Sequence, residues 1–276
     1  MAARQGGVKA RKKRPMTIPP APTPAPATPP APGPQTADHL LNGAVRLGQA
    51  ARGYRAGLDA ALLAAACDAK AGQRVLDVGC GAGGALLAAA YRRPLAQFTG
   101  VERDEDALSL ARANIIDNGM RHVSVVAGDV GAGFAALGLA AFDSVICNPP
   151  FFDDPDTLRG PAAEKQDAWM AQDGLPAWTA FLTKAAREGG AVTLIHRADR
   201  LGDILLGFGS KIGSVQVMPI HPFADAPAKR VLVRGVKTGR APMLLLPPLV
   251  LHERGGAKHM PQVEAILRGE AAIDWR

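Results

Sequence analysis

The sequence predicts an α/β fold, a doubly wound, mostly parallel seven-stranded sheet with helices on both faces. From Asp38 onward, short and nearly continuous apolar runs alternate with helix-like segments, which is typical of strands buried on both faces. A glycine-rich turn (residues 79–84) follows the first apolar run, and the motif Asn148-Pro149-Pro150-Phe151 follows the fourth. Because ligands of such sheets bind at the carboxyl ends of the strands, the two motifs predict one shared site.

Hydrophobic spacing and helix-ending residues define the elements in chain order. The expected strands are residues 74–78, 98–102, 123–128, 143–147, 191–196, 215–219 and 231–236. The expected helices are residues 58–69, 85–91, 104–118, 177–187 and 201–208. Gly72 and Pro94 end the first two helices, while Asp104 caps the third and Gly119 follows it.

The first 36 residues have the composition of an extended, solvated tail rather than of a folded segment. Ten of the 23 prolines lie between Pro15 and Pro34, which excludes a helix interior or a sheet. Six of the chain's cations precede them, so the net charge of +7 comes mostly from this tail. These six are Arg4, Lys9, Arg11, Lys12, Lys13 and Arg14. We therefore expect a basic, proline-rich tail over residues 1–36 and one catalytic domain over residues 37–276.

Composition also excludes several classes of protein. No apolar run reaches the ~18 residues of a membrane span, so we expect no membrane partner. The three cysteines form no Cys-x-x-Cys pair, which favours a reducing, cytoplasmic location. The six histidines lack metal-ligand spacing, and we expect no metal. We also expect a monomer.

The glycine-rich turn and the acids at successive strand ends predict a nucleoside-containing ligand. The spacing Gly79-x-Gly81-x-Gly83 differs from the Gly-x-Gly-x-x-Gly of dinucleotide sites, although a nicotinamide cofactor stays an alternative. Asp77 precedes the glycines and suits a ligand with an ammonium group. Glu102 ends the second strand, where a carboxylate can accept hydrogen bonds from ribose hydroxyls. Asp129 ends the third strand and could accept from an adenine amino group beside Val130. S-adenosylmethionine fits this set of residues.

The motif Asn148-Pro149-Pro150-Phe151 predicts the chemistry at the other side of the site. The lone pair of an adenine exocyclic nitrogen is delocalised into the ring, which makes it a weak nucleophile. The Asn148 side-chain oxygen and the Pro149 carbonyl can accept its two N–H groups and orient the lone pair toward a methyl donor. Two prolines make the turn rigid, and Phe151 offers a stacking face worth ~1–3 kcal/mol. A plain turn at a strand end is the alternative for this motif alone.

These motifs resemble the small-domain branch of the S-adenosylmethionine-dependent methyltransferases with an Asn-Pro-Pro-aromatic signature and a Rossmann-like fold. Residues 53–63, Gly-Tyr-Arg-Ala-Gly-Leu-Asp-Ala-Ala-Leu-Leu, are similar to a segment of the bacterial tRNA(Val) adenine N6-methyltransferases. The resemblance implies that Tyr54, Arg55 and Asp59 lie against the cofactor. Residues 249–252 and 263–268 resemble the carboxyl end of that family, whereas the tail and Phe151 in place of tyrosine depart from it.

The resemblance implies methyl transfer to N6 of an unpaired adenine, in particular one in a tRNA anticodon loop. Guanine N2-methyltransferases of ribosomal RNA and glutamine methyltransferases of release factors share the signature and stay open as alternatives, as does an RNA-binding protein that has lost catalysis. A cluster of cations in the carboxyl-terminal third, together with the basic tail, is the expected RNA surface. Its members are Lys229, Arg230, Arg234, Lys237, Arg240, Arg254 and Lys258.

Overall fold

The computed structural model describes residues 1–3, 35–51, 55–151 and 174–276, and the described residues from Gln35 onward belong to one compact unit. All seven expected strands are present in these ranges, together with four others. The strands are β1 (Gln35–Leu40), β2 (Val45–Ala50), β3 (Arg74–Val78), β4 (Gln97–Glu102), β5 (Val123–Ala127), β6 (Phe142–Cys147), β7 (Ala186–Arg197), β8 (Ile212–His221), β9 (Arg230–Lys237), β10 (Leu244–Leu245) and β11 (Leu249–Val250). The helices are α1 (Leu58–Ala66), α2 (Gly84–Arg92), α3 (Glu105–Asp117), α5 (Leu175–Ala185), α6 (Leu201–Phe208) and α7 (Pro261–Arg268).

The strand order confirms the doubly wound, mostly parallel sheet. It runs β5-β4-β3-β6-β7-β9-β8-β10, and β11 also pairs with β8. Among the described strands of this sheet, only β9 runs antiparallel to its two neighbours, β7 and β8. The chain moves outward from β3 through β4 to β5 and then returns to β6 on the other side of β3. The order therefore reverses between β3 and β6, which is where a sheet of this kind forms its ligand crevice.

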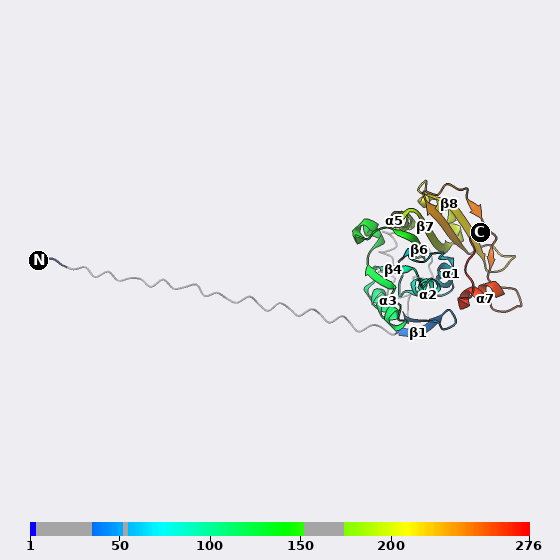
Figure 1. Cartoon of the computed structure of the whole chain (residues 1–276), viewed down its shortest axis with the longest axis horizontal. Coiled ribbons are helices and arrows are strands. Elements are labelled where there is room, and N and C mark those ends of the chain that lie inside the picture. The colour runs from blue at the N-terminus through cyan, green and yellow to red at the C-terminus, as the bar shows by residue number, and fades with distance from the viewer. Residues whose placement is uncertain (4–34, 52–54, 152–173) are drawn as a thin grey trace. The chain divides into compact units, whose positions relative to one another are not determined.

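Helices cover both faces of the sheet (Figure 1). On one face α1, α2 and α7 pack against the apolar side chains of Val75, Ile146 and Ile195. On the other face α5 and α6 pack against Val78, Val145 and further residues of the same strands. Strands buried on both faces account for the nearly continuous apolar runs in the sequence.

Three expectations about element boundaries are corrected by the structure. Residues 35–50 form the β1–β2 hairpin, so Gln35 and Thr36 belong to a strand rather than to the tail expected over residues 1–36. The expected helix 177–187 is instead α5, Leu175–Ala185, with a proline in its first turn. Ala186 and Arg187 belong to β7, because the backbone of Ala186 already pairs with Phe142 of β6. The rest of the expected tail lies outside the described residues, apart from residues 1–3.

Candidate active site

The glycine-rich turn and the Asn-Pro-Pro-Phe motif lie side by side at the carboxyl edge of the sheet. Val78 of β3 is the register partner of Cys147 of β6, and each of the two is the last residue of its strand. Gly79 and Asn148 therefore begin two neighbouring loops on strands about 4.8 Å apart. Two motifs separated by about seventy residues thus lie next to each other, as expected of motifs that follow parallel strands.

Backbone geometry explains why glycine recurs at every second position of this turn. Gly79, Gly81 and Gly83 have φ values of +70°, +55° and +94°, which side chains rarely tolerate. A Cβ atom on Gly79 would also lie 2.6 Å from the ring of Trp178. Gly79 N and Cys80 N donate hydrogen bonds to the Val101 carbonyl at 2.8 and 3.0 Å, which fixes the turn on the end of β4.

Glu102 holds the same turn through its carboxylate. One oxygen accepts from Gly81 N at 2.9 Å, and the other accepts from Arg103 N at 2.8 Å and Asp104 N at 2.9 Å. Each carboxylate oxygen has two lone pairs, so further acceptor capacity is left for ligand hydroxyls. Asp104 caps α3 through Ala107 N, as the sequence predicts.

Asp77 is a buried carboxylate directly behind the turn. It is 2% exposed, and its Oδ2 atom has no hydrogen-bond partner among the described residues. Burial, together with the nearby Glu102 carboxylate, raises the pKa of Asp77 to about 7, although a backbone hydrogen bond from Leu86 opposes the shift. A cationic group placed here would favour the ionised form.

Trp178 is a site residue that sequence reasoning missed. It lies on α5, is 8% exposed, and packs its indole ring onto Gly79. Its Nε1 atom is buried without a hydrogen-bond partner in the described part of the chain. An unpartnered buried acceptor (Asp77) and an unpartnered buried donor (Trp178) therefore flank the glycine turn. These features fit S-adenosylmethionine. Asp77 can accept from its ammonium group, Glu102 can accept from its ribose hydroxyls, and the glycine turn lets the backbone approach the ligand closely.

Asp129, Val130, Arg55 and Tyr54 are also expected to bind the cofactor, and the side chains of the described ones have different surroundings. Asp129 caps a short 3₁₀ helix that begins at Val130, accepts from Gly131 N at 2.8 Å, and pairs with Arg103 at 3.6 Å. The Arg55 side chain contacts Thr36 and Asp38 of β1. Tyr54 lies outside the described residues. Their contribution to cofactor binding stays a prediction.

The segment before α1 does reach the glycine turn, although through a different residue. Ala56 packs so closely on the start of α2 that a Cβ atom on Gly84 would lie 2.2 Å from the Ala56 Cβ. This contact brings residues 55–57 against the end of the turn, while the Asp59 side chain points to β9 and pairs with Arg230 at 3.0 Å.

The Asn148–Phe151 motif has protein side chains on two sides of its aromatic ring. Pro149 is buried, Pro150 is exposed, and Phe151 is half-buried. The imidazole of His196 meets the Phe151 ring edge to face, with centroids 5.3 Å apart. The Arg230 guanidinium lies over the ring at 4.5 Å from its centroid. One face of Phe151, expected to stack a base, is thus already covered by a cation.

His196 is a second residue that the sequence did not single out. It lies at the carboxyl end of β7 and is 1% exposed. Burial lowers the pKa of His196 to about 4, although the nearby Pro150 carbonyl opposes the shift. His196 is therefore neutral at pH 7, and it packs against the motif as an uncharged ring. Only its place at a strand end beside Arg197 could have drawn attention to it.

The cations expected to form one RNA surface do not all lie on the same face of β9. Arg230 and Arg234 share one face of β9, whereas Lys237 points to the opposite face, because side chains alternate along a strand. Four of the seven cations also pair with carboxylates. The pairs are Arg230–Asp59 at 3.0 Å, Arg234–Asp68 at 2.7 Å, Lys237–Glu188 at 3.5 Å and Arg254–Asp225 at 3.2 Å. The expected patch is therefore largely neutralised.

Other chemistry has little support in the described residues. Cys67, Cys80 and Cys147 are buried free thiols, and burial raises the pKa of each. The part of the chain that the structure describes has no group of three His, Cys, Asp or Glu residues able to hold a metal ion. None of its helices is long and apolar enough to cross a membrane.

Comparisons with known proteins show similarity to methyltransferases. Residues 55–163 match the family model described as methyltransferase small domain. A release factor glutamine methyltransferase of Shewanella oneidensis is 35% identical over 118 residues, which cover 42% of this chain and 40% of that protein. A ribosomal protein uL3 glutamine methyltransferase of Bordetella pertussis is 34% identical over 103 residues, covering 37% of this chain and 34% of that protein. The chain thus spans less than half the length of these relatives.

A solved structure is similar over most of the chain. A predicted O-methyltransferase, protein Atu636 from Agrobacterium tumefaciens, has a TM-score of 0.66 and 29% identity, covering 78% of this chain and 98% of that one. The fold and cofactor are those of the S-adenosylmethionine-dependent methyltransferases. The domain that the family model matches contains both the glycine turn and the Asn-Pro-Pro-Phe motif. The expected cofactor, S-adenosylmethionine, is therefore confirmed.

Proposed function

We propose that this protein methylates the side-chain amide nitrogen of a glutamine in a protein substrate. The observation that carries the proposal is the Asn148-Pro149-Pro150 turn beside the cofactor turn, in a chain whose relatives are glutamine methyltransferases. Bound S-adenosylmethionine supplies a methyl group attached to a positively charged sulfur. The substrate nitrogen must then present its lone pair to that methyl group.

A glutamine amide nitrogen is a weak nucleophile, like an adenine amine, because its lone pair is delocalised into the neighbouring carbonyl. Its two N–H groups need two acceptors at fixed positions. The Asn148 side-chain oxygen and the Pro149 carbonyl provide them, and the buried Pro149 keeps the turn in place. Asn148 remains uncharged near pH 7, so its role is to orient the amide rather than to remove a proton.

Two contacts favour an amide over a nucleic-acid base. The Arg230 guanidinium covers a face of Phe151 that a base would need for stacking. The cations of the carboxyl-terminal third are mostly paired with carboxylates, which weakens attraction to phosphates. An amide side chain is narrower than a purine and needs neither a free aromatic face nor a basic surface.

The competing acceptor is the N6 amine of an RNA adenine, which the basic tail over residues 4–14 favours. One experiment separates the two. The purified full-length protein is incubated with S-adenosylmethionine labelled in its methyl group, and with either total cellular protein or total tRNA from a strain lacking this protein. We expect label in protein, located on a glutamine by peptide mass spectrometry. Label in tRNA, recovered as N6-methyladenosine, would establish the RNA function instead.

A further inference from the structure

A polar pocket of about 210 Å³ lies at the opposite end of the strands from the active site. It is formed by the loop after α1 and by the beginnings of β6 and β7, with one side chain from β9. Its lining residues are Asp68, Lys70, Gln73, Asp143, Ser144, Arg187, Gly189, Ala191 and Arg234. The same β6 and β7 strands carry Asn148 and His196 at their other ends, so this pocket is distinct from the methyl-transfer site.

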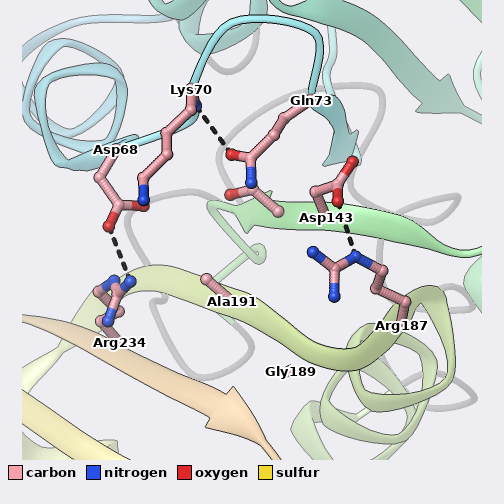
Figure 2. Close-up of a pocket in the computed structure, with 9 residues that line it drawn as sticks. Asp68, Lys70, Gln73, Asp143, Arg187, Gly189, Ala191 and Arg234 are labelled. Carbon is pink, nitrogen blue, oxygen red and sulfur yellow. Dashed lines mark hydrogen bonds and ion pairs between the residues drawn. The ribbon is translucent and has the colours of Figure 1, made fainter.

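Two ion pairs form opposite walls of the pocket (Figure 2). Arg234 pairs with Asp68 at 2.7 Å on one side, and Arg187 pairs with Asp143 at 2.7 Å on the other. From the loop above, Gln73 extends toward the space between the pairs and Lys70 extends on the side of Asp68 (Figure 2). Groups that can donate hydrogen bonds thus reach the pocket from three sides.

The charges around the pocket leave an excess of one positive charge. Three cations line it (Lys70, Arg187 and Arg234) against two carboxylates. The Asp143 carboxylate is fully engaged, because it accepts from Arg74 N at 2.8 Å as well as from Arg187, and these hydrogen bonds hold its pKa below the usual range. Lys70 has no ion pair within the described ranges, so its ammonium group is available to a ligand.

Two buried polar atoms of the lining residues also have no partner. Ser144 is 2% exposed, and its hydroxyl makes no hydrogen bond to any residue that the structure describes. The Nε atom of Arg234 is likewise buried and unpartnered in that part of the chain. Buried polar groups in proteins are normally satisfied by protein, water or ligand. The two atoms are therefore polar groups in the wall of the pocket whose hydrogen bonds no described residue supplies.

We propose that the pocket binds a small tetrahedral oxyanion of the size of phosphate. Lysine and arginine are the side chains that recognise phosphate groups, and the excess positive charge favours an anion. Donors on several sides suit a tetrahedral ion better than a planar carboxylate. The volume is smaller than the ~300–1,000 Å³ of sites for drug-sized ligands, which favours an ion or a small phosphomonoester.

Calorimetric titration of the full-length protein with inorganic phosphate tests the proposal, with sodium chloride at equal ionic strength as the reference. We expect saturable binding and a phosphate-dependent rise in Tm, because a ligand of the native state stabilises it. Lys70→Gln and Ser144→Ala should each weaken phosphate binding about tenfold. Lys258→Gln removes one charge from an exposed lysine elsewhere and should leave the affinity unchanged.

Without phosphate, Ser144→Ala should not lower the Tm, since it removes a hydroxyl that has no partner. This result separates loss of ligand binding from loss of folding. Glycerol 3-phosphate and acetate serve as further probes. Tighter binding of glycerol 3-phosphate would identify a phosphomonoester as the source of the anion. Equal binding of acetate, no saturable heat with phosphate, or equal phosphate affinity in the two pocket variants and the parent protein would overturn the proposal.

Discussion

The guanidinium of Arg230 lies 4.5 Å from the centre of the Phe151 ring, and its Nε atom lies 3.0 Å from a carboxylate oxygen of Asp59. A residue of β9 and a residue of α1 thereby hold the aromatic ring of the Asn-Pro-Pro-Phe motif. A cation over an aromatic face contributes ~0.5–1 kcal/mol when exposed and about 2 kcal/mol when desolvated. Arg230 therefore contacts the aromatic ring of the motif directly, and Asp59 balances its charge.

Arg230→Met should lower kcat by about tenfold while leaving the affinity for S-adenosylmethionine unchanged. The physical reason is that Phe151 loses the contact that fixes its ring, and a poorly oriented acceptor reacts more slowly. Steady-state kinetics and calorimetry measure the two quantities. Arg230→Lys should recover part of the loss because it keeps a cation near the ring.

Arg254→Met is the matched control for this substitution. Arg254 lies 4.4 Å from the centre of the Phe223 ring and pairs with Asp225 at 3.2 Å, so it has the same two kinds of contact away from the site. The kcat of the Arg254→Met variant should equal that of the unmodified protein. An equal loss in both variants would mean that Arg230 acts only on stability.

Asn148→Ala should lower kcat by ~10²–10³, which is the usual cost of removing one preorganised hydrogen-bonding group from a reacting centre. Cofactor affinity should stay within a few-fold, because the proposed contact of Asn148 is with the acceptor and not with the cofactor. Single-turnover kinetics with saturating S-adenosylmethionine measures the chemical step. Near-normal turnover would rule out the proposed role of Asn148.

Glu102→Ala should weaken S-adenosylmethionine binding by roughly 1–3 kcal/mol, since ribose hydroxyls and the Gly81 amide lose an acceptor. Glu102→Gln keeps one oxygen and should lose less. Calorimetry with the cofactor checks this order, and Glu264→Gln on α7 provides a control for the loss of one carboxylate. Equal affinities in all three variants would mean that the ribose binds elsewhere.

Asp77→Asn should abolish tight cofactor binding and yet stabilise the free protein above pH 7. A carboxyl group whose pKa rises from 3.8 unfolded to about 7 folded binds its proton more tightly in the native state. The free energy of unfolding therefore falls as the pH rises from 3.8 to 7, by at most about 4 kcal/mol. The Asp77→Asn variant should not show this decrease in the free energy of unfolding, because asparagine does not ionise.

Thermal unfolding between pH 4 and pH 8 without cofactor tests the prediction. His196 contributes the opposite trend in part of this range, because its lowered pKa costs stability as the pH falls from 6.5 toward 4. The difference between the two proteins cancels that contribution. If the stability of both proteins changed with pH in the same way, ionisation of Asp77 would cost the free protein no stability, and the prediction would be wrong.

The sequence predicted the central strands and the meeting of the two motifs because both follow from local patterns. Apolar runs give the strands, and parallel strands place their carboxyl ends at one edge. The sequence did not predict Trp178 and His196 as site residues, because their contacts with Gly79 and Phe151 depend on how separate elements pack. The pairing of the expected RNA-surface cations with carboxylates was not predicted for a similar reason, since a count of cations along the chain cannot reveal distant partners such as Asp59 and Asp68.

The β1–β2 hairpin sets a minimum length for a working domain. The Asn114 side chain on α3 accepts from Gly48 N at 2.7 Å and donates to the carbonyls of Gly48 and Ala82, each at 2.9 Å. A single amide group thus ties the hairpin to the cofactor turn. Trimming the chain up to residue 34 should spare this tie, whereas cutting into residues 35–50 should release the turn even though every motif residue remains. The boundary of the cofactor site along the chain is therefore set well ahead of the first glycine.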